Sequence, residues 1–113
     1  MVRLLQEVWW AVSELKLEKE IELDVSDYAK HQKDCLVLKL NVWGRIGWPD
    51  RLYLHFKGKV LFIEFKQPGE KPKRLQEFIH EKLRRYGFRI EVVDNVRDGR
   101  AIIDDFTSDN SHV

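Results

Sequence analysis

Three charged residues interrupt apolar, strand-like sequence at two places in the chain. Asp50 closes the segment Gly47-Trp48-Pro49-Asp50, while Glu64 and Lys66 end the apolar run that begins at Val60. Two carboxylates at the end of an apolar sheet face need compensation, because unpaired buried charge is costly. A hard divalent cation can supply it, since Mg²⁺ prefers a few carboxylates together with water and phosphate oxygens. The chemistry predicted is metal-assisted hydrolysis of a phosphodiester bond, with Lys66 orienting the water or neutralising charge on the phosphorane.

Whether these side chains meet depends on the hairpin that joins their segments. A three-residue loop Lys57-Gly58-Lys59 places Asp50 opposite Lys66 and Leu52 opposite Glu64. The three charged side chains then share one face, because strand side chains alternate. A two-residue loop would turn Asp50 to the other face, so the site requires the longer turn, which Gly58 favours. A structural ion pair with Lys66 is the alternative, and the Pro-Asp element at hairpin distance counts against it.

The elements that must position these residues alternate along the chain, which we interpret as one domain over residues 1–113. We expect helices at 3–15, 17–32, 72–86 and 97–106, and strands at 35–41, 51–56, 60–66 and 88–93. The strand at 60–66 is apolar on both faces, as in a central strand covered by helices on both sides. The fold class predicted is therefore α/β, a mixed β-sheet flanked by helices on both faces.

Two further expectations concern the third helix and the end of the chain. The helix at 72–86 is expected to face the core with its apolar residues, which are Leu75, Phe78, Ile79, Leu83 and Tyr86. The polar segment 107–113 is expected to be a flexible tail.

The composition excludes several classes of protein. Of 113 residues, 43% are hydrophobic and 35% charged, which is typical of a soluble globular domain. No apolar run reaches the roughly 20 residues of a membrane span, and the N-terminus lacks a cleavable signal pattern, so we expect no membrane partner and a cytoplasmic location. A single cysteine, Cys35, excludes an internal disulfide and a thiolate zinc cage.

Charge is distributed unevenly although the net charge is only +1. Residues 39–89 hold 13 Lys and Arg against 5 Asp and Glu, a balance of +8. This segment could present a basic face to a polyanion such as DNA. A solvated surface of mixed charge is the alternative.

Asp50, Glu64 and Lys66, here called the charged set, fall within or beside a series of short motifs. These are Gly44–Arg51, Phe62–Lys66, Pro68-Gly69-Glu70, Gln76 and Gly87. In this order they resemble a stand-alone VRR-NUC domain, a branch of the PD-(D/E)xK nuclease superfamily, over roughly residues 18–95. The resemblance implies a restriction-endonuclease-like core and a Mg²⁺ or Mn²⁺ cofactor.

The resemblance also implies roles for individual residues. Asp50, Glu64 and the backbone carbonyl of Phe65 would bind the metal. Lys66 would be catalytic, and Gln76 would support it by positioning water or phosphate.

The family uses one more acidic residue, from the first core helix, as a metal or water ligand. Glu18 and Glu22 are four residues apart on the stripe that contains Ile21, so either could lean over the sheet. The family's spacing of acid and apolar residue selects Glu18, and Glu22 stays as the alternative.

Contacts to DNA are expected from basic residues near the motifs: Arg45, Arg51, Lys71, Lys73 and Arg74. A solvated helix face is the alternative for about half of the basic residues on or before the third helix. Trp43 and Trp48 could stack on exposed bases, although packing of the loop is the more common role of such tryptophans.

The substrate and assembly expected follow partly from the resemblance. Stand-alone members similar to this chain are phage or bacterial homodimers that act on branched DNA, Holliday junctions included. Apolar residues within 1–16 suit a dimer contact, with an extra core layer as the alternative. The function predicted is thus a metal-dependent endonuclease selective for branched DNA, in a bacterial or phage-infected cell. A flap or end-processing nuclease and a catalytically inactive DNA-binding module are the alternatives.

Overall fold

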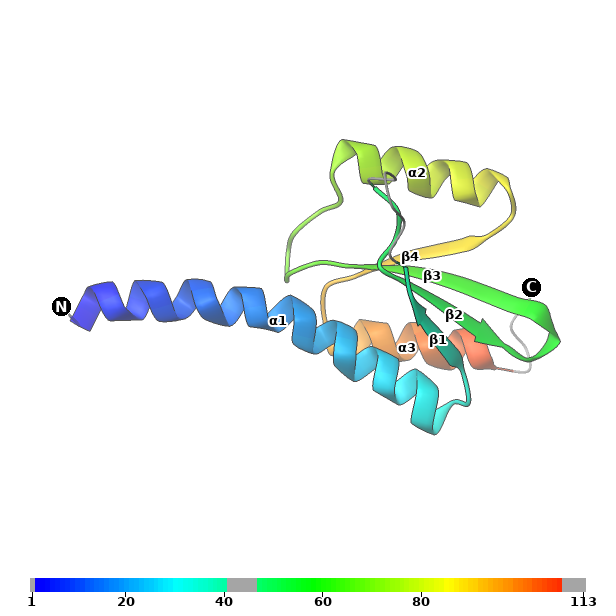
Figure 1. Ribbon diagram of the computed structural model, residues 1–113, viewed down its shortest axis with the longest axis horizontal. Coiled ribbons are helices and arrows are strands. Elements are labelled where there is room, and N and C mark those ends of the chain that lie inside the picture. The colour runs from blue at the N-terminus through cyan, green and yellow to red at the C-terminus, as the bar shows by residue number, and fades with distance from the viewer. Residues whose placement is uncertain (1, 41–46, 109–113) are drawn as a thin grey trace.

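The structure is a computed structural model that describes residues 2–40 and 47–108, with side chains from residue 17 onward. Its elements in chain order are α1 (Val2–Gln32), β1 (Leu36–Lys39), β2 (Arg51–His55), the 3-10 turn η1 (Phe56–Gly58), β3 (Lys59–Phe65), α2 (Arg74–Arg85), β4 (Arg89–Val93) and α3 (Val96–Thr107) (Figure 1). Within the described ranges, no helix has the length and apolar character needed to cross a membrane.

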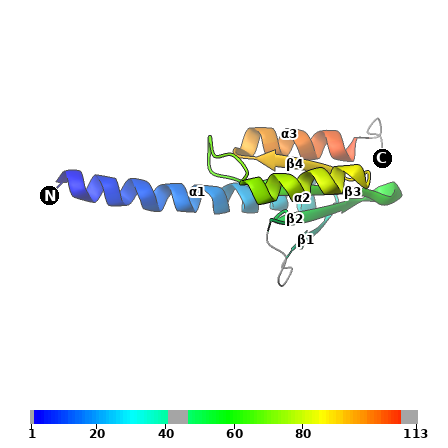
Figure 2. The same cartoon turned by 90° about the horizontal axis from the view of Figure 1, so that it is seen from above.

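The sheet has four strands in the order β1-β2-β3-β4. Its first three strands are antiparallel, and β4 pairs with β3 in parallel after the crossover through α2. Helix α2 covers one face, while α1 and α3 lie together on the other (Figures 1 and 2). The predicted mixed α/β sheet between helices is therefore confirmed.

The two faces of β3 contribute side chains to two separate apolar cores. Leu61, Ile63 and Phe65 pack with α1 and α3 in the larger core. Phe62 packs with Leu83 of α2 in the smaller one. Glu64 and Lys66 share the face of Phe62, since strand side chains alternate. The charged set thus belongs to the side of the sheet that α2 covers.

The N-terminal helix is a single element, where two helices were expected. Nothing between residues 15 and 17 breaks a helix, because neither glycine nor proline occurs there. The N-terminal half of α1 extends beyond the sheet, and the C-terminal half packs under it (Figure 1).

Helix α2 is turned relative to the expected core face. Leu75, Phe78 and Tyr86 are exposed, whereas His80 and Leu83 are buried. The expectation that all apolar residues of this helix face the core is therefore wrong. A polar residue, His80, takes the position under the helix.

The hairpin register differs from the expected one by two residues. The loop is Phe56–Gly58, and Lys59 already belongs to β3, opposite His55. Lys59 is held in the strand because its buried ammonium group donates to the carbonyl oxygens of Phe106 at 3.2 Å and Ser108 at 2.7 Å. The loop still has three residues, so the alternation of faces is the one expected.

The expected tail begins later than residue 107. Thr107 is the last residue of α3, and its hydroxyl donates to the carbonyl of Ile103. Residues 109–113 lie outside the described part of the chain.

Candidate active site

Asp50 stands at the entry of β2, beside the end of β3. Its backbone nitrogen donates to Ile63 at 3.1 Å, and its carbonyl accepts from Leu40 at 2.9 Å. Since Arg51 pairs with Ile63, Asp50 falls opposite Glu64 and not opposite Lys66, as the expected register had it. The Asp50 carboxylate accepts a hydrogen bond from the Phe65 amide at 2.7 Å. The two carboxylates therefore meet across the end of the hairpin.

The electrostatics of this pair are unfavourable without a counter-charge. Burial raises the pKa of Asp50 to about 7, against the lowering effect of the hydrogen bond from Phe65. The negative charges of Glu64, Glu22 and Glu18 add to the rise. Like charges brought together out of water disfavour the ionised form of each other. A cation at this point would offset the cost.

Gln76 links α2 to the carboxylate of Glu64. Its Nε2 donates to Glu64 Oε2 at 3.2 Å, and its Oε1 accepts from the backbone nitrogen of Lys73 at 2.8 Å. The second bond satisfies the backbone N–H of the N-cap residue at the start of α2, which is the half of a capping box that Gln76 can supply. Both ends of the amide are therefore engaged, and Gln76 fixes the orientation of Glu64.

His80 joins the site although no motif pointed to it. It is 2% exposed, and its Nε2 lies 3.7 Å from Glu64 Oε1. Neither atom has a hydrogen-bond partner in the structure. The signal in the sequence is its spacing, because His80 lies four residues after Gln76 and hence on the same side of α2. The spacing of histidines to one another does not point to His80, because its partner is a glutamate on the sheet.

Lys66 follows β3 and is 6% exposed. Its backbone nitrogen donates to Val93, which extends the β3–β4 ladder by one residue. Its ammonium group lies 3.8 Å from Glu70 Oε1. The Gly69 amide in the same connection donates to Asp94 at 2.9 Å. These contacts anchor the segment between β3 and α2 beside the carboxylate pair.

The two candidate glutamates of α1 are distinguished by their partners. Glu22 accepts from Arg51 at 3.2 and 3.3 Å. Glu18 is half-buried, and its pKa is raised by burial and by Glu70, while Lys66 lowers it. Glu18 therefore belongs to the electrostatic surroundings of Lys66, and Glu22 is taken up by Arg51.

The donor set fits a hard divalent cation. In the described ranges, no three side chains of His, Cys, Asp or Glu are grouped to hold a metal by themselves. Asp50 and Glu64 offer carboxylate oxygens, and Phe65 between Glu64 and Lys66 offers a backbone carbonyl. Few carboxylates plus a carbonyl and water are what Mg²⁺ takes in proteins. The buried, unpartnered Oε1 of Glu64 shows that the carboxylate lacks full compensation from the protein.

The expected DNA contacts have different surroundings. Lys71 and Lys73 are exposed on the connection that leads into α2, and Arg74 is exposed at the first position of α2. Arg51 is largely withdrawn from solvent in its ion pair with Glu22. Arg45 and Trp43 lie outside the described residues.

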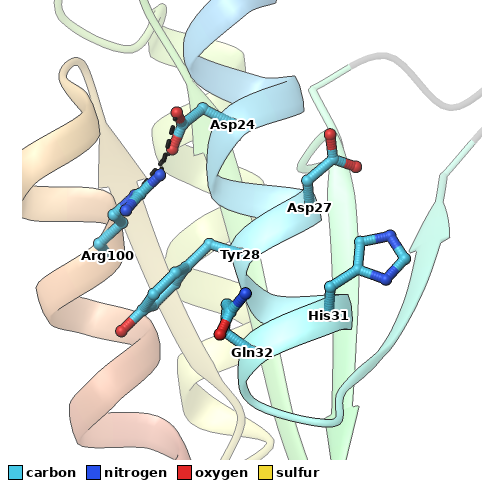
Figure 3. Close-up of a pocket in the computed structure, with 6 residues that line it drawn as sticks. All are labelled: Asp24, Asp27, Tyr28, His31, Gln32 and Arg100. Carbon is cyan, nitrogen blue, oxygen red and sulfur yellow. Dashed lines mark hydrogen bonds and ion pairs between the residues drawn. The ribbon is translucent and has the colours of Figure 1, made fainter.

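A hollow between α1 and α3, about 500 Å³ in volume, contains none of these residues (Figure 3). Arg100 donates to Asp24 at 2.8 and 3.2 Å and stacks over Tyr28, with 4.7 Å to the ring centroid. Asp27 and His31 point away from this pair (Figure 3). The hollow is the surface of a helix–helix contact.

Comparisons with known proteins agree with the motifs. No family model matches the sequence. Over 52 residues the chain is 44% identical to "Putative nuclease p44" of Acyrthosiphon pisum secondary endosymbiont phage 1. That match covers 46% of this chain and 56% of the relative, so it spans little more than half of the relative's length.

A solved structure agrees over a longer part of the chain. It is described as "VRR_NUC domain", with a TM-score of 0.71 and 28% identity, and the match covers 77% of this chain and 94% of that one. The resemblance predicted from the motifs, and the restriction-endonuclease-like fold, are confirmed.

Proposed function

We propose that this chain, a VRR-NUC domain, is a nuclease that hydrolyses phosphodiester bonds in DNA with Mg²⁺ or Mn²⁺. The observation that carries the proposal is the pair Asp50 and Glu64, opposed at the end of the β2–β3 hairpin with the buried Lys66 beside them. A fold alone does not establish an activity, but this set supplies the ligands and the cation that phosphodiester hydrolysis needs.

The metal would be held by Asp50, Glu64 and the carbonyl of Phe65. When bound, it supplies a Lewis acid for a phosphate oxygen and lowers the pKa of a coordinated water. Gln76 and His80 act on Glu64 from α2, and we assign them the orientation of that ligand. Glu18 would be the additional acidic residue that holds the metal or a water bound to it.

We assign Lys66 the stabilisation of the transition state. Its ammonium group is withdrawn from water, where a fixed charge has the greatest effect on charge developing at a phosphate. The neighbouring Glu70 carboxylate is exposed and can be replaced by substrate. In that position Lys66 can donate a hydrogen bond to the attacking water or to the phosphorane oxygens.

For the substrate we propose branched DNA, Holliday junctions included, cut by a homodimer. Support comes from the basic balance of residues 39–89 and from the exposed Lys71, Lys73 and Arg74. The projecting N-terminal half of α1 is available for a second copy (Figure 1). The phage relative favours action inside a bacterial or phage-infected cell.

The test is a cleavage assay with labelled four-way junction, flap and linear duplex in Mg²⁺, Mn²⁺ or EDTA. The full chain is compared with Lys66→Met, Asp50→Asn and, as a control of equal charge change, Lys30→Ala on the exposed surface of α1. We expect metal-dependent products, fastest on the junction, which Lys66→Met reduces by about 10²–10³-fold. Absence of metal-dependent products on every substrate would overturn the proposal, as would products that Lys66→Met leaves unchanged.

A further inference from the structure

A small cavity lies between α2 and the segment that precedes β2. It measures about 210 Å³ and is lined by Trp48, Ile79, Lys82, Leu83 and Tyr86. Sites for drug-sized ligands measure roughly 300–1,000 Å³. The cavity is therefore suited to a single planar ring system.

Its lining combines a rigid wall with a free one. Trp48 is half-buried and packs against the cluster of Phe62 and Leu83, which fixes the position of its indole. Tyr86, at the C-terminal cap of α2, is 68% exposed. An aromatic side chain so exposed contributes little to the core and leaves its ring face available to a ligand.

The charge around the cavity fits a nucleotide. Lys82 lines it and is exposed, so its ammonium group lies at the rim. A base stacked between aromatic walls carries its phosphate at the rim, where a lysine can meet it. An uncharged apolar ligand would have no use for this rim.

The distance from the carboxylates also fits. Trp48 precedes Asp50 by two residues, and Leu83 follows Gln76 by seven along α2. Seven residues of helix span about 10 Å, so the far end of the cavity lies within a few nucleotides' reach of a phosphate at Glu64.

We infer that the cavity between Trp48 and Tyr86 binds one unpaired nucleobase and thereby selects DNA with unpaired bases over fully paired duplex. The base leaves its stack for two aromatic surfaces, and this exchange is cheap only where the base is already unpaired. The inference rests on the proposed function, because it assumes DNA as the substrate.

The test is binding of DNA by the full chain in EDTA, where no cleavage occurs. Junctions and flaps carry 2-aminopurine at successive unpaired positions near the branch, and a linear duplex is the paired control. Tyr86→Ala removes the free wall, and Tyr86→Phe keeps it. Phe78→Ala is the matched control, since Phe78 is 64% exposed on the same helix and does not line the cavity.

We expect quenched 2-aminopurine at one unpaired position and about tenfold weaker binding of branched DNA by Tyr86→Ala, the order of one lost stacking contact. Binding of linear duplex should stay the same, and Tyr86→Phe and Phe78→Ala should bind as the parent does. Equal binding by Tyr86→Ala, or equal losses on branched and paired DNA, would overturn the inference.

Failure of the proposed function would look different. Base-dependent binding without any metal-dependent cleavage would retain the cavity's role and reject the nuclease. Cleavage that is indifferent to Tyr86 would retain the nuclease and reject the cavity's role.

Discussion

Nε2 of His80 and Oε1 of Glu64 face each other at 3.7 Å in the interior, and neither has a hydrogen-bond partner. A buried donor and a buried acceptor left unpaired each cost free energy, which a small approach of the two would recover. The other oxygen of Glu64 is held by Gln76. Helix α2 thus places one side chain beside each oxygen of the Glu64 carboxylate, Gln76 at Oε2 and His80 at Oε1.

Replacement of His80 by leucine should weaken metal binding more than it weakens the fold. Leucine fills a similar volume and removes the unpaired nitrogen, so the free energy of unfolding should change little. The orientation of Glu64 is lost, and the metal affinity should fall about 10–100-fold, as for other residues behind a ligand. Calorimetric titration with Mn²⁺, alongside urea unfolding in EDTA, measures both quantities. His31→Leu, on the exposed face of α1, is the control; unchanged Mn²⁺ affinity in His80→Leu would assign His80 to packing.

Replacement of Asp50 by asparagine should stabilise the metal-free protein at alkaline pH. The folded pKa of Asp50, about 7, lies above the ordinary value of 3.8 for an aspartate, so ionisation opposes folding as the pH rises through this window. Asparagine keeps an oxygen for the Phe65 amide and carries no charge. Thermal unfolding in EDTA should show Asp50→Asn about 1 kcal/mol more stable at pH 8, after allowance for solvent screening. The gain should vanish below about pH 4, where both side chains are neutral. Equal stability of the two proteins at pH 8 would contradict this.

The ion pair of Arg51 and Glu22 should stabilise the fold and contribute little to DNA affinity. Both side chains are largely shielded from solvent, and the guanidinium group reaches Glu22 through two nitrogens. A double-mutant cycle of Arg51→Ala and Glu22→Ala should give a coupling of about 1 kcal/mol, the upper end for exposed pairs. Urea unfolding measures the coupling, and DNA binding in EDTA is followed in parallel. A large loss of DNA affinity in Arg51→Ala without loss of stability would return Arg51 to the DNA contacts expected from sequence.

Gly47 should tolerate alanine less well than Gly58 does. Both have positive φ, +94° and +72°, so a side chain strains the backbone at either position. A Cβ at Gly47 would lie 3.0 Å from the carbonyl oxygen of Leu75, whereas nothing lies within 4 Å at Gly58. We expect Gly58→Ala to cost about 1 kcal/mol and Gly47→Ala roughly 1 kcal/mol more. The added steric conflict pushes the Pro49-Asp50 segment away from α2, so cleavage by Gly47→Ala should fall as well. Equal stability of the two variants in urea would show that the loop adapts freely.

Much of the fold follows from local sequence. The apolar character of both faces of β3 predicted a central strand covered on two sides, and the structure has it. The identity of the face that carries Glu64 followed from the alternation of side chains, which survives any shift by two residues. The meeting of Asp50 with this face was therefore predictable from a three-residue loop.

The exact pairing was not predictable, because tertiary contacts determine it. Lys59 looks like a turn residue, but its ammonium group caps the C-terminus of α3, 47 residues away in sequence at Phe106. That contact places Lys59 in the strand, opposite His55. The register therefore shifts by two residues, and Asp50 lies opposite Glu64 instead of Lys66. The role of His80 was not predictable from the sequence for a related reason. A single histidine in an amphipathic helix gains its contact only when the sheet places a carboxylate, here Glu64, beside it.

The length of α1 has a mechanical consequence. At 1.5 Å per residue its 31 residues make a rod of roughly 45 Å. One half is clamped beneath the sheet and the other projects beyond it (Figures 1 and 2). Glu18 lies near the middle of α1, shortly before Ile21, the first buried residue of the half that packs under the sheet. Under the proposed function, a second copy that bound the projecting half of α1 would also influence the position of Glu18, and dimer formation would then affect the metal site.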